Sequence, residues 1–218
     1  MALTKFNFNS FDVTSAASKG LGFNASANGF STIDPGAMTL IKTLTASSSS
    51  TLSFVNGSSD VVLDNTYPIY LFKIINAHPS SQSNFQVNFR DGGSSYDATK
   101  TTTVFNVQAN EANNNTDLNY SGSYDLAQST NFQSLAESTG TGNDECCSGE
   151  LFLLDPSSTT FVKHFISQVN NYYYEDFTMS WYIAGYCNTT TAIDGVQFKF
   201  ASGNIDSGTI KLYGIKDS

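Results

Sequence analysis

The sequence predicts an all-β protein, an antiparallel two-sheet β-sandwich preceded by an extended N-terminal arm. Ser, Thr and Asn carry the polarity, while charged residues make up only 13% of the 218 residues. These three side chains compete with helical hydrogen bonds and so favour strands and turns. Segments of alternating apolar and polar residues recur roughly every 8–15 residues between turn residues, which is typical of a sandwich. The length suits one large sandwich, and we expect one main domain.

Residues 1–35 are expected to form an extended arm, and residues 36–218 the sandwich domain. Phe6 and Phe8 are spaced to share one face of a short strand. The segment that follows them is rich in Asn, Ser, Ala and Gly and has too few apolar residues to build a core. We therefore expect the arm to take its order from a neighbour such as another subunit, with Phe6 and Phe8 as candidate contacts.

Four strands are predicted in the first half of the sandwich, at 38–45, 51–55, 70–75 and 85–90. The apolar spacing of the first would also suit a helix, but its threonines favour a strand. The third is largely apolar on both faces, as at the centre of a sandwich, so Leu71, Ile74 and Ile75 should be buried. The Asn, Pro and Ser residues of 76–81 predict a chain reversal.

The middle of the chain is predicted to hold one regular strand and several loops. Residues 101–107 alternate as a strand, whereas 110–119 is expected to be a long exposed loop rich in Asn, Asp and Glu. Residues 120–126 form at most a short edge strand. Apolar spacing within 128–135 allows a single helical turn, and 137–148 is expected to be a second loop.

The last third shows the most regular alternation. Five strands are predicted there, at 150–154, 160–169, 176–187, 195–200 and 209–215. Trp181, in the third of them, is expected in the core. The Asn-Asn-Tyr-Tyr-Tyr segment predicts a turn, so Tyr172, Tyr173 and Tyr174 cannot all be buried in a monomer. We expect at least one to touch a neighbouring subunit or a ligand. Exposed aromatics suit both protein interfaces and sugar binding, and we favour an interface.

The formal net charge of −9 argues against binding to a nucleic-acid backbone, because so acidic a protein would release few counterions from it. The N-terminal residues contain no apolar signal-peptide core, and no apolar run approaches the length of a membrane span. We therefore expect no nucleic-acid partner and no membrane span, and a protein that remains in the compartment where it is made.

The residues that could act in catalysis form no recognisable constellation. His78 and His164 are the two histidines, and neither has a convincing partner for base catalysis. No Gly-x-Ser-x-Gly elbow, phosphate-binding loop or zinc-binding helix occurs. Cys146, Cys147 and Cys187 are odd in number and lack zinc-like spacing, which favours reduced thiols. The sequence thus predicts a protein that is not an enzyme and needs no metal or cofactor, with glycoside hydrolysis by loop carboxylates as an alternative.

Three segments of the chain resemble a known family. They are Tyr67-x-x-Tyr70-x-x-Lys-Ile-Ile-Asn-Ala-His-Pro-Ser-Ser, Asn88-Phe-Arg-Asp-Gly-Gly-x-x-Tyr-Asp, and the closing Gly208-Thr-Ile-Lys-Leu-Tyr-Gly-Ile-Lys. Over about residues 50–216 the chain resembles jelly-roll virion structural proteins of marine tailed bacteriophages. The resemblance implies a jelly-roll sandwich in a non-enzymatic structural protein that is often trimeric.

The role implied by this resemblance is that of an outer capsid decoration or cement protein. Such a protein would be a homo-oligomer in contact with other virion proteins, such as the major capsid protein, and would be assembled in the host cytoplasm. The alternative is a receptor-binding or glycan-binding tail-fibre or knob module. In that case the loops 110–119 and 137–148 would recognise a host surface glycan.

Overall fold

The computed structural model describes residues 20–23, 26, 29–33 and 36–216, which form fourteen β-strands. These residues contain no helix. They fall into two compact units divided between Thr39 and Leu40. Phe6 and Phe8 lie outside the described residues.

The first unit contains a β-hairpin. Strand β1 (Gly20–Phe23) pairs with β2 (Phe30–Ile33) in antiparallel register, with Phe23 opposite Phe30. The two rings stack with their centroids 5.2 Å apart. Because an isolated two-stranded hairpin is marginally stable in water, these exposed rings are expected to need a further apolar surface.

The second unit is a jelly-roll sandwich. Four strands of one sheet lie in the order β3-β14-β5-β10, and four strands of the facing sheet lie in the order β4-β13-β6-β9. In the first order the strands are β3 (Met38–Thr45), β14 (Ile205–Ile215), β5 (Ile69–Pro79) and β10 (Cys147–Leu154). In the second they are β4 (Leu52–Val55), β13 (Gly195–Phe200), β6 (Ser83–Arg90) and β9 (Gln133–Thr139). Strands that are consecutive in the chain alternate between the two sheets, which is the winding of a double-sheet jelly roll. The consecutive pairs are β3/β4, β5/β6, β9/β10 and β13/β14.

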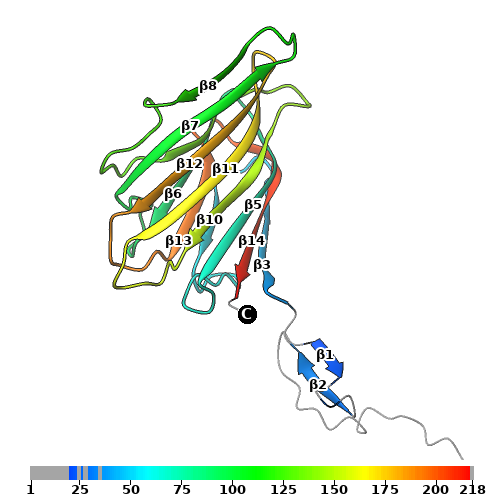
Figure 1. Cartoon of the computed structure of the whole chain (residues 1–218), viewed down its shortest axis with the longest axis vertical. Coiled ribbons are helices and arrows are strands. Elements are labelled where there is room, and N and C mark those ends of the chain that lie inside the picture. Colours follow the sequence, from blue (N-terminus) through cyan, green and yellow to red (C-terminus); the bar gives the residue numbers. More distant parts are fainter. Residues whose placement is uncertain (1–19, 24–25, 27–28, 34–35, 217–218) are drawn as a thin grey trace, which may run out of the picture. The chain divides into compact units, whose positions relative to one another are not determined.

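Two inserted hairpins widen one sheet. Strands β11 (Lys163–Tyr173) and β12 (Phe177–Cys187) follow β10, while β7 (Lys100–Asn110) and β8 (Thr116–Tyr120) follow β6. They continue the first sheet to the order β3-β14-β5-β10-β11-β12-β7-β8, here called the large sheet. Strands β4, β13, β6 and β9 form the small sheet, and β6 and β13 lie behind the large sheet in Figure 1. The two sheets are joined where β9 pairs with β11, with Thr139 opposite Tyr173.

The core lies between the two sheets and is rich in aromatic side chains. Phe72 of the large sheet meets Phe54 of the small sheet with ring centroids 5.3 Å apart. Trp181 is 1% exposed, as predicted, and its indole N–H donates a hydrogen bond to Asn171 Oδ1 over 3.1 Å. Strand β11 alternates buried and exposed residues over most of its length, so it has one face in the core and one face outside.

The prediction that the strand at 70–75 is buried on both faces was partly wrong. Leu71 and Ile74 are buried as expected, but Ile75 is 41% exposed. Ile75 points away from the small sheet, and no second layer covers it among the described residues. The strand is also longer than expected, because β5 continues through Asn76 to Pro79 and the chain reverses only at 80–82.

Three other local predictions were wrong. Asn170–Tyr173 is not a turn but the end of β11, where it pairs in register with β12. The helical turn that the spacing within 128–135 allows does not form, and these residues instead lead into β9, which begins at Gln133. The loop at 110–119 contains most of β8, while 121–126 is not a strand. For Asn170–Tyr173 and for β8, pairing within a hairpin, of β11 with β12 and of β7 with β8, outweighs the local turn preference of the residues.

Candidate functional site

The outer face of the large sheet, which points away from the small sheet, carries an unusual share of exposed apolar side chains. They include Ile75, Phe105, Leu118, Tyr120 and Ile166. The corresponding face of the small sheet is polar, and there Gln197 Nε2 donates a hydrogen bond to Ser53 Oγ over 2.9 Å. Exposed apolar surface concentrated on one face marks an interaction site.

The register of the strands lines up one straight row of side chains across seven strands of this outer face. We call it the central row, and it consists of Lys211, Lys73, Glu150, Gln168, Tyr182, Phe105 and Tyr120. Each neighbour in the row is the direct cross-strand partner of the next. Directly opposed side chains in a sheet are close enough to interact, so the row is a continuous strip.

The central row changes from charged at one end to aromatic at the other. Lys73 Nζ donates a hydrogen bond to Glu150 Oε2 over 2.5 Å. Gln168 Nε2 donates to the hydroxyl of Tyr182 over 3.1 Å. The rings of Phe105 and Tyr182 are stacked, with centroids 4.8 Å apart and an angle of 7° between their planes. The aromatic end is therefore a flat platform, and the Tyr182 hydroxyl keeps its own proton for a further acceptor.

A second row runs beside the central row and is almost entirely apolar. We call it the apolar row, and it consists of Tyr213, Leu71, Phe152, Ile166, Ala184 and Thr103. Ile166 is 53% exposed on β11, the middle strand of the seven. A large β-branched side chain thus projects from the centre of the face without a covering layer among the described residues.

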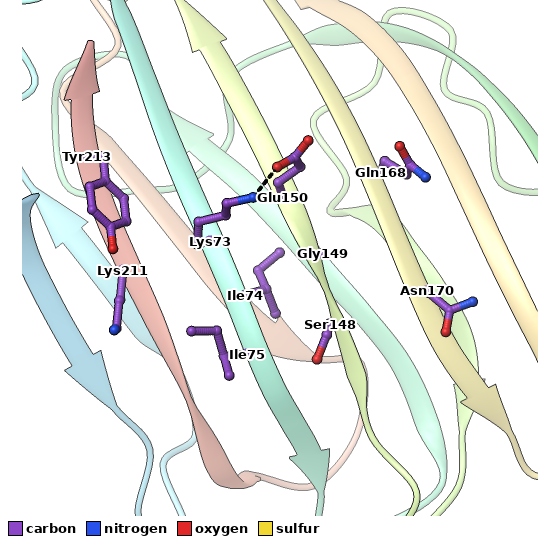
Figure 2. Close-up of a pocket in the computed structure, with 10 residues that line it drawn as sticks. All are labelled: Lys73, Ile74, Ile75, Ser148, Gly149, Glu150, Gln168, Asn170, Lys211 and Tyr213. Carbon is purple, nitrogen blue, oxygen red and sulfur yellow. Dashed lines mark hydrogen bonds and ion pairs between the residues drawn. The ribbon is translucent and has the colours of Figure 1, made fainter. Parts of the chain in front are cut away.

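Three open hollows lie along the outer face. The first, of about 640 Å³, lies between the Lys73–Glu150 pair, Tyr213 and Asn170 (Figure 2). The second, of about 230 Å³, is lined by Phe105, Ile166 and Tyr182 among others. The third, of about 420 Å³, continues past Ile166 to His164 and Tyr186. A broad, uneven face of this kind suits an extended partner better than an enclosed small molecule.

Little net charge is present on the two rows. Lys211, Lys73 and Glu150 are their charged members, which gives two positive charges and one negative charge. The whole chain carries −9. A second acidic protein can therefore approach this face with less repulsion than it would meet on average over the surface.

The tyrosines predicted as contacts lie in three different environments. Tyr172 is half-buried on the outer side of β11, and its hydroxyl lies 3.0 Å from Asp176 Oδ1 and 3.2 Å from Glu111 Oε1. The hydrogen bond to Asp176 raises the pKa of Tyr172. Tyr173 packs against the core, and burial raises its pKa. Tyr174 is exposed, so it is the one of the three that best suits a contact.

Two lysines that the sequence did not mark as unusual are fully buried in the large sheet. Lys100 and Lys163 lie on either side of Cys187 in the register of three adjacent strands. Lys100 Nζ donates to the carbonyl of Asn131 over 2.7 Å, and Lys163 Nζ donates to the carbonyl of Thr189 over 3.1 Å. Burial lowers the pKa of Lys100 to about 8 and lowers that of Lys163 as well.

The cysteines are free thiols, as the sequence favours. Cys147 and Cys187 are buried and Cys146 is half-buried. Burial raises the pKa of all three, to about 12 for Cys187. A thiol with so high a pKa is a poor nucleophile and a poor metal ligand at neutral pH.

The described residues hold no group of three or more His, Cys, Asp or Glu side chains that could bind a metal ion. Nor do they include a helix long and apolar enough to cross a membrane. His78 Nε2 hydrogen-bonds the carbonyl of Gly142 over 3.0 Å, and the imidazole of His164 packs edge-on against Tyr186. Both histidines thus have structural neighbours in the described part of the chain.

Comparisons of the chain with models of protein families, with curated proteins and with solved structures found no match.

The outer face is the main candidate site that sequence reasoning missed. The alternation within β11 and β12 already separates Ile166 and Tyr182 from the buried residues. It does not reveal which strands are neighbours, and the rows exist only because seven strands are in register. The interpretation of 70–75 as buried on both faces also hid Lys73 and Ile75 as surface residues.

Proposed function

We propose that this chain is a non-enzymatic structural component of a phage virion and acts through protein–protein contacts. Its specific role in this proposal is that of an outer capsid decoration or cement protein. The outer face of the large sheet is the observation that carries the proposal. It combines exposed aliphatic and aromatic side chains with little net charge. The acidic remainder of the surface would keep assembled particles from associating with one another.

The virion role rests on the family resemblance, and the fold is compatible with it. Two of the three resembling segments contribute β5 and β14, which are neighbours in the large sheet. Lys73 of one segment lies directly opposite Lys211 of the other, and both belong to the central row. The segments that resemble virion proteins therefore build part of the candidate protein-binding face.

Cryo-electron microscopy of phage particles that carry this chain tests the proposal. Many copies in a regular lattice on the capsid support a decoration or cement role. A few copies at the tip of a fibre contradict that role and favour receptor binding. Absence of the chain from purified particles contradicts both. Particles produced with a chain lacking residues 1–35 would show whether the arm is required for incorporation.

Glycan binding is the second candidate, and the first hollow is the observation that favours it. Tyr213 offers an aromatic ring, while Asn170 and the Lys73–Glu150 pair offer hydrogen-bonding groups around the same space (Figure 2). Rings and polar groups in one open groove suit a sugar. Binding on a glycan array that is lost in Tyr213→Ala but kept in Gln197→Ala, on the small sheet, would support this candidate.

Self-association is part of the main proposal. The family resemblance favours a trimer, whereas the register of the outer face favours a twofold pair.

A further inference from the structure

We infer that the outer face of the large sheet binds a second copy of this chain, with a twofold axis that runs along β11. The inference rests on the proposed function of this face as a protein-binding surface. It goes further by naming the partner, the symmetry and the residues that meet. The central row, the apolar row and the charge of the face carry it.

The central row is complementary to a second copy of itself that runs in the opposite direction across the strands. It spans seven strands, and β11 is the fourth from either end. When two such faces meet about a twofold axis parallel to β11, each strand lies over its mirror position in the row. Gln168 and Ile166 of β11 then lie over the same residues of the second copy, because a twofold interface brings one patch onto itself.

The pairs closest to the axis match in chemistry. Glu150 of one copy lies over Tyr182 of the other, where the phenol can donate to the carboxylate. Two Gln168 amides can exchange hydrogen bonds, since each amide holds both donors and an acceptor. Farther out, Lys73 lies over the stacked rings of Phe105 and Tyr182, an arrangement that suits a cation–π contact.

The apolar row matches in size about the same axis. Ile166 meets Ile166 at the centre. Phe152, one strand to one side of β11, lies over Ala184, one strand to the other side. A large side chain thus faces a small one on both sides of the axis. Packed sheets lie within about 30° of each other, and an axis parallel to β11, which keeps the β11 strands of the two copies parallel, falls within this range.

The area is sufficient for a stable pair. Seven strands at ~4.8 Å span roughly 30 Å. Six of them have eight to eleven residues, which at ~3.3 Å per residue run roughly 26–36 Å, and β8 has five. The face therefore measures about 800–1,000 Å², against about 800 Å² per partner in a standard interface. Its rows carry one net positive charge on a chain of −9, so this is a face through which two acidic copies can approach each other.

Sedimentation of the full chain gives the first test. We expect twice the mass of one chain. Ile166→Glu should weaken the association by at least about tenfold, because two carboxylates would meet at the axis. Phe161→Glu is the matched control: Phe161 is 70% exposed and lies just before β11, outside both rows, so this variant should remain paired. An unchanged near-ultraviolet circular dichroism spectrum confirms that each variant is folded.

Site-directed crosslinking tests the axis itself, in a Cys146→Ser background. Gln168→Cys should crosslink to itself with a short bismaleimide, which spans the ~10 Å between packed sheets. Lys211→Cys alone should not crosslink, because its two copies would lie at opposite ends of the central row. Mixing it with Tyr120→Cys should restore a crosslink. Self-crosslinking of Lys211→Cys, or none by Gln168→Cys, would overturn this axis.

The outcomes separate this inference from the proposed function. A monomeric chain that still decorates capsids overturns the twofold pair and leaves the structural role intact. A twofold pair that is absent from particles supports the inference and contradicts the virion role. Three chain masses, with Ile166→Glu unaffected, would favour the trimer and overturn the pair. A monomer that binds glycans through Tyr213 would assign the face to a sugar instead.

Discussion

At the scale of single residues, Lys100 is a buried charge that the sequence did not mark. Lys100 is an inward-facing residue of β7, where an apolar side chain would be ordinary. Its ammonium has the Asn131 carbonyl as a hydrogen-bond partner, and its desolvation is not offset by a salt bridge among those between described residues. The buried charge therefore costs stability at neutral pH.

Lys100→Met is expected to stabilise the protein at pH 7 by about 1–3 kcal/mol, because it removes a buried charge. The pKa of Lys100 is about 8 in the folded chain, below its ordinary value of 10.5. The folded state therefore loses its proton first, and the penalty is full below pH 8 and fades as the pH rises to 10.5. Urea unfolding of variant and wild type at several pH values measures this difference.

Lys199→Met serves as the control for this prediction, since Lys199 is only partly buried, over the ring of Phe132. This variant should lose rather than gain stability at pH 7, because it removes the cation–π contact with Phe132. A Lys100→Met difference that stays constant from pH 7 to pH 10.5 would mean that the amine is not the source of the effect.

The tyrosines at the end of β11 should separate into one stability residue and one contact residue. Tyr173→Ala is expected to lower the free energy of unfolding by about 1–3 kcal/mol, because its ring packs on the core beside Phe177. Tyr174→Ala should leave it nearly unchanged, because Tyr174 is exposed. Chemical denaturation measures both. Loss of particle incorporation in Tyr174→Ala would identify a contact, whereas a large loss of stability would contradict its placement.

At the scale of single elements, close approach between β10 and β11 shapes the floor of the first hollow. Gly149 lines that hollow and lies where the β10–β5 register shifts. A Cβ at this position would lie 2.2 Å from the carbonyl oxygen of Gln168 and 2.6 Å from the Cα of Val169. Both are backbone atoms, which cannot move aside without displacing β11.

Gly149→Ala is therefore expected to lower the free energy of unfolding by about 1–3 kcal/mol, the usual cost of overpacking. Gly122→Ala is the control, because a Cβ there would meet its nearest neighbour, Tyr120 Cε1, at an ordinary 3.9 Å. Thermal unfolding of the two variants compares them. Equal melting temperatures for both would show that β10 and β11 can separate without cost.

At the scale of the whole molecule, the division between Thr39 and Leu40 separates the hairpin unit from the sandwich. A chain beginning at residue 36 keeps β3 and every other strand of both sheets. We expect it to unfold at the same temperature as the full chain, as measured by calorimetry. A clear drop in melting temperature would show that residues before 36 stabilise the sandwich.

The sequence by itself determined the all-β class and most of the strands. Alternation with a period of two and clusters of turn residues are local properties, so segments such as 195–200 and 209–215 could be assigned without knowing their neighbours. Trp181 could be placed in the core because it lies in a strongly alternating segment. The conformation of 170–173 was decided by strand pairing, because pairing with β10 as well as with β12 outweighed the turn preference of Asn.

Only the tertiary structure decided which residues share the outer face. Lys73, Gln168 and Phe105 lie far apart in the sequence and become neighbours in one row because β5, β10, β11, β12 and β7 pair in register. The exposure of Ile75 and the burial of Lys100 were decided in the same way. Strand order and register depend on pairings across the whole chain, and a one-residue shift would move each of these side chains to the opposite face.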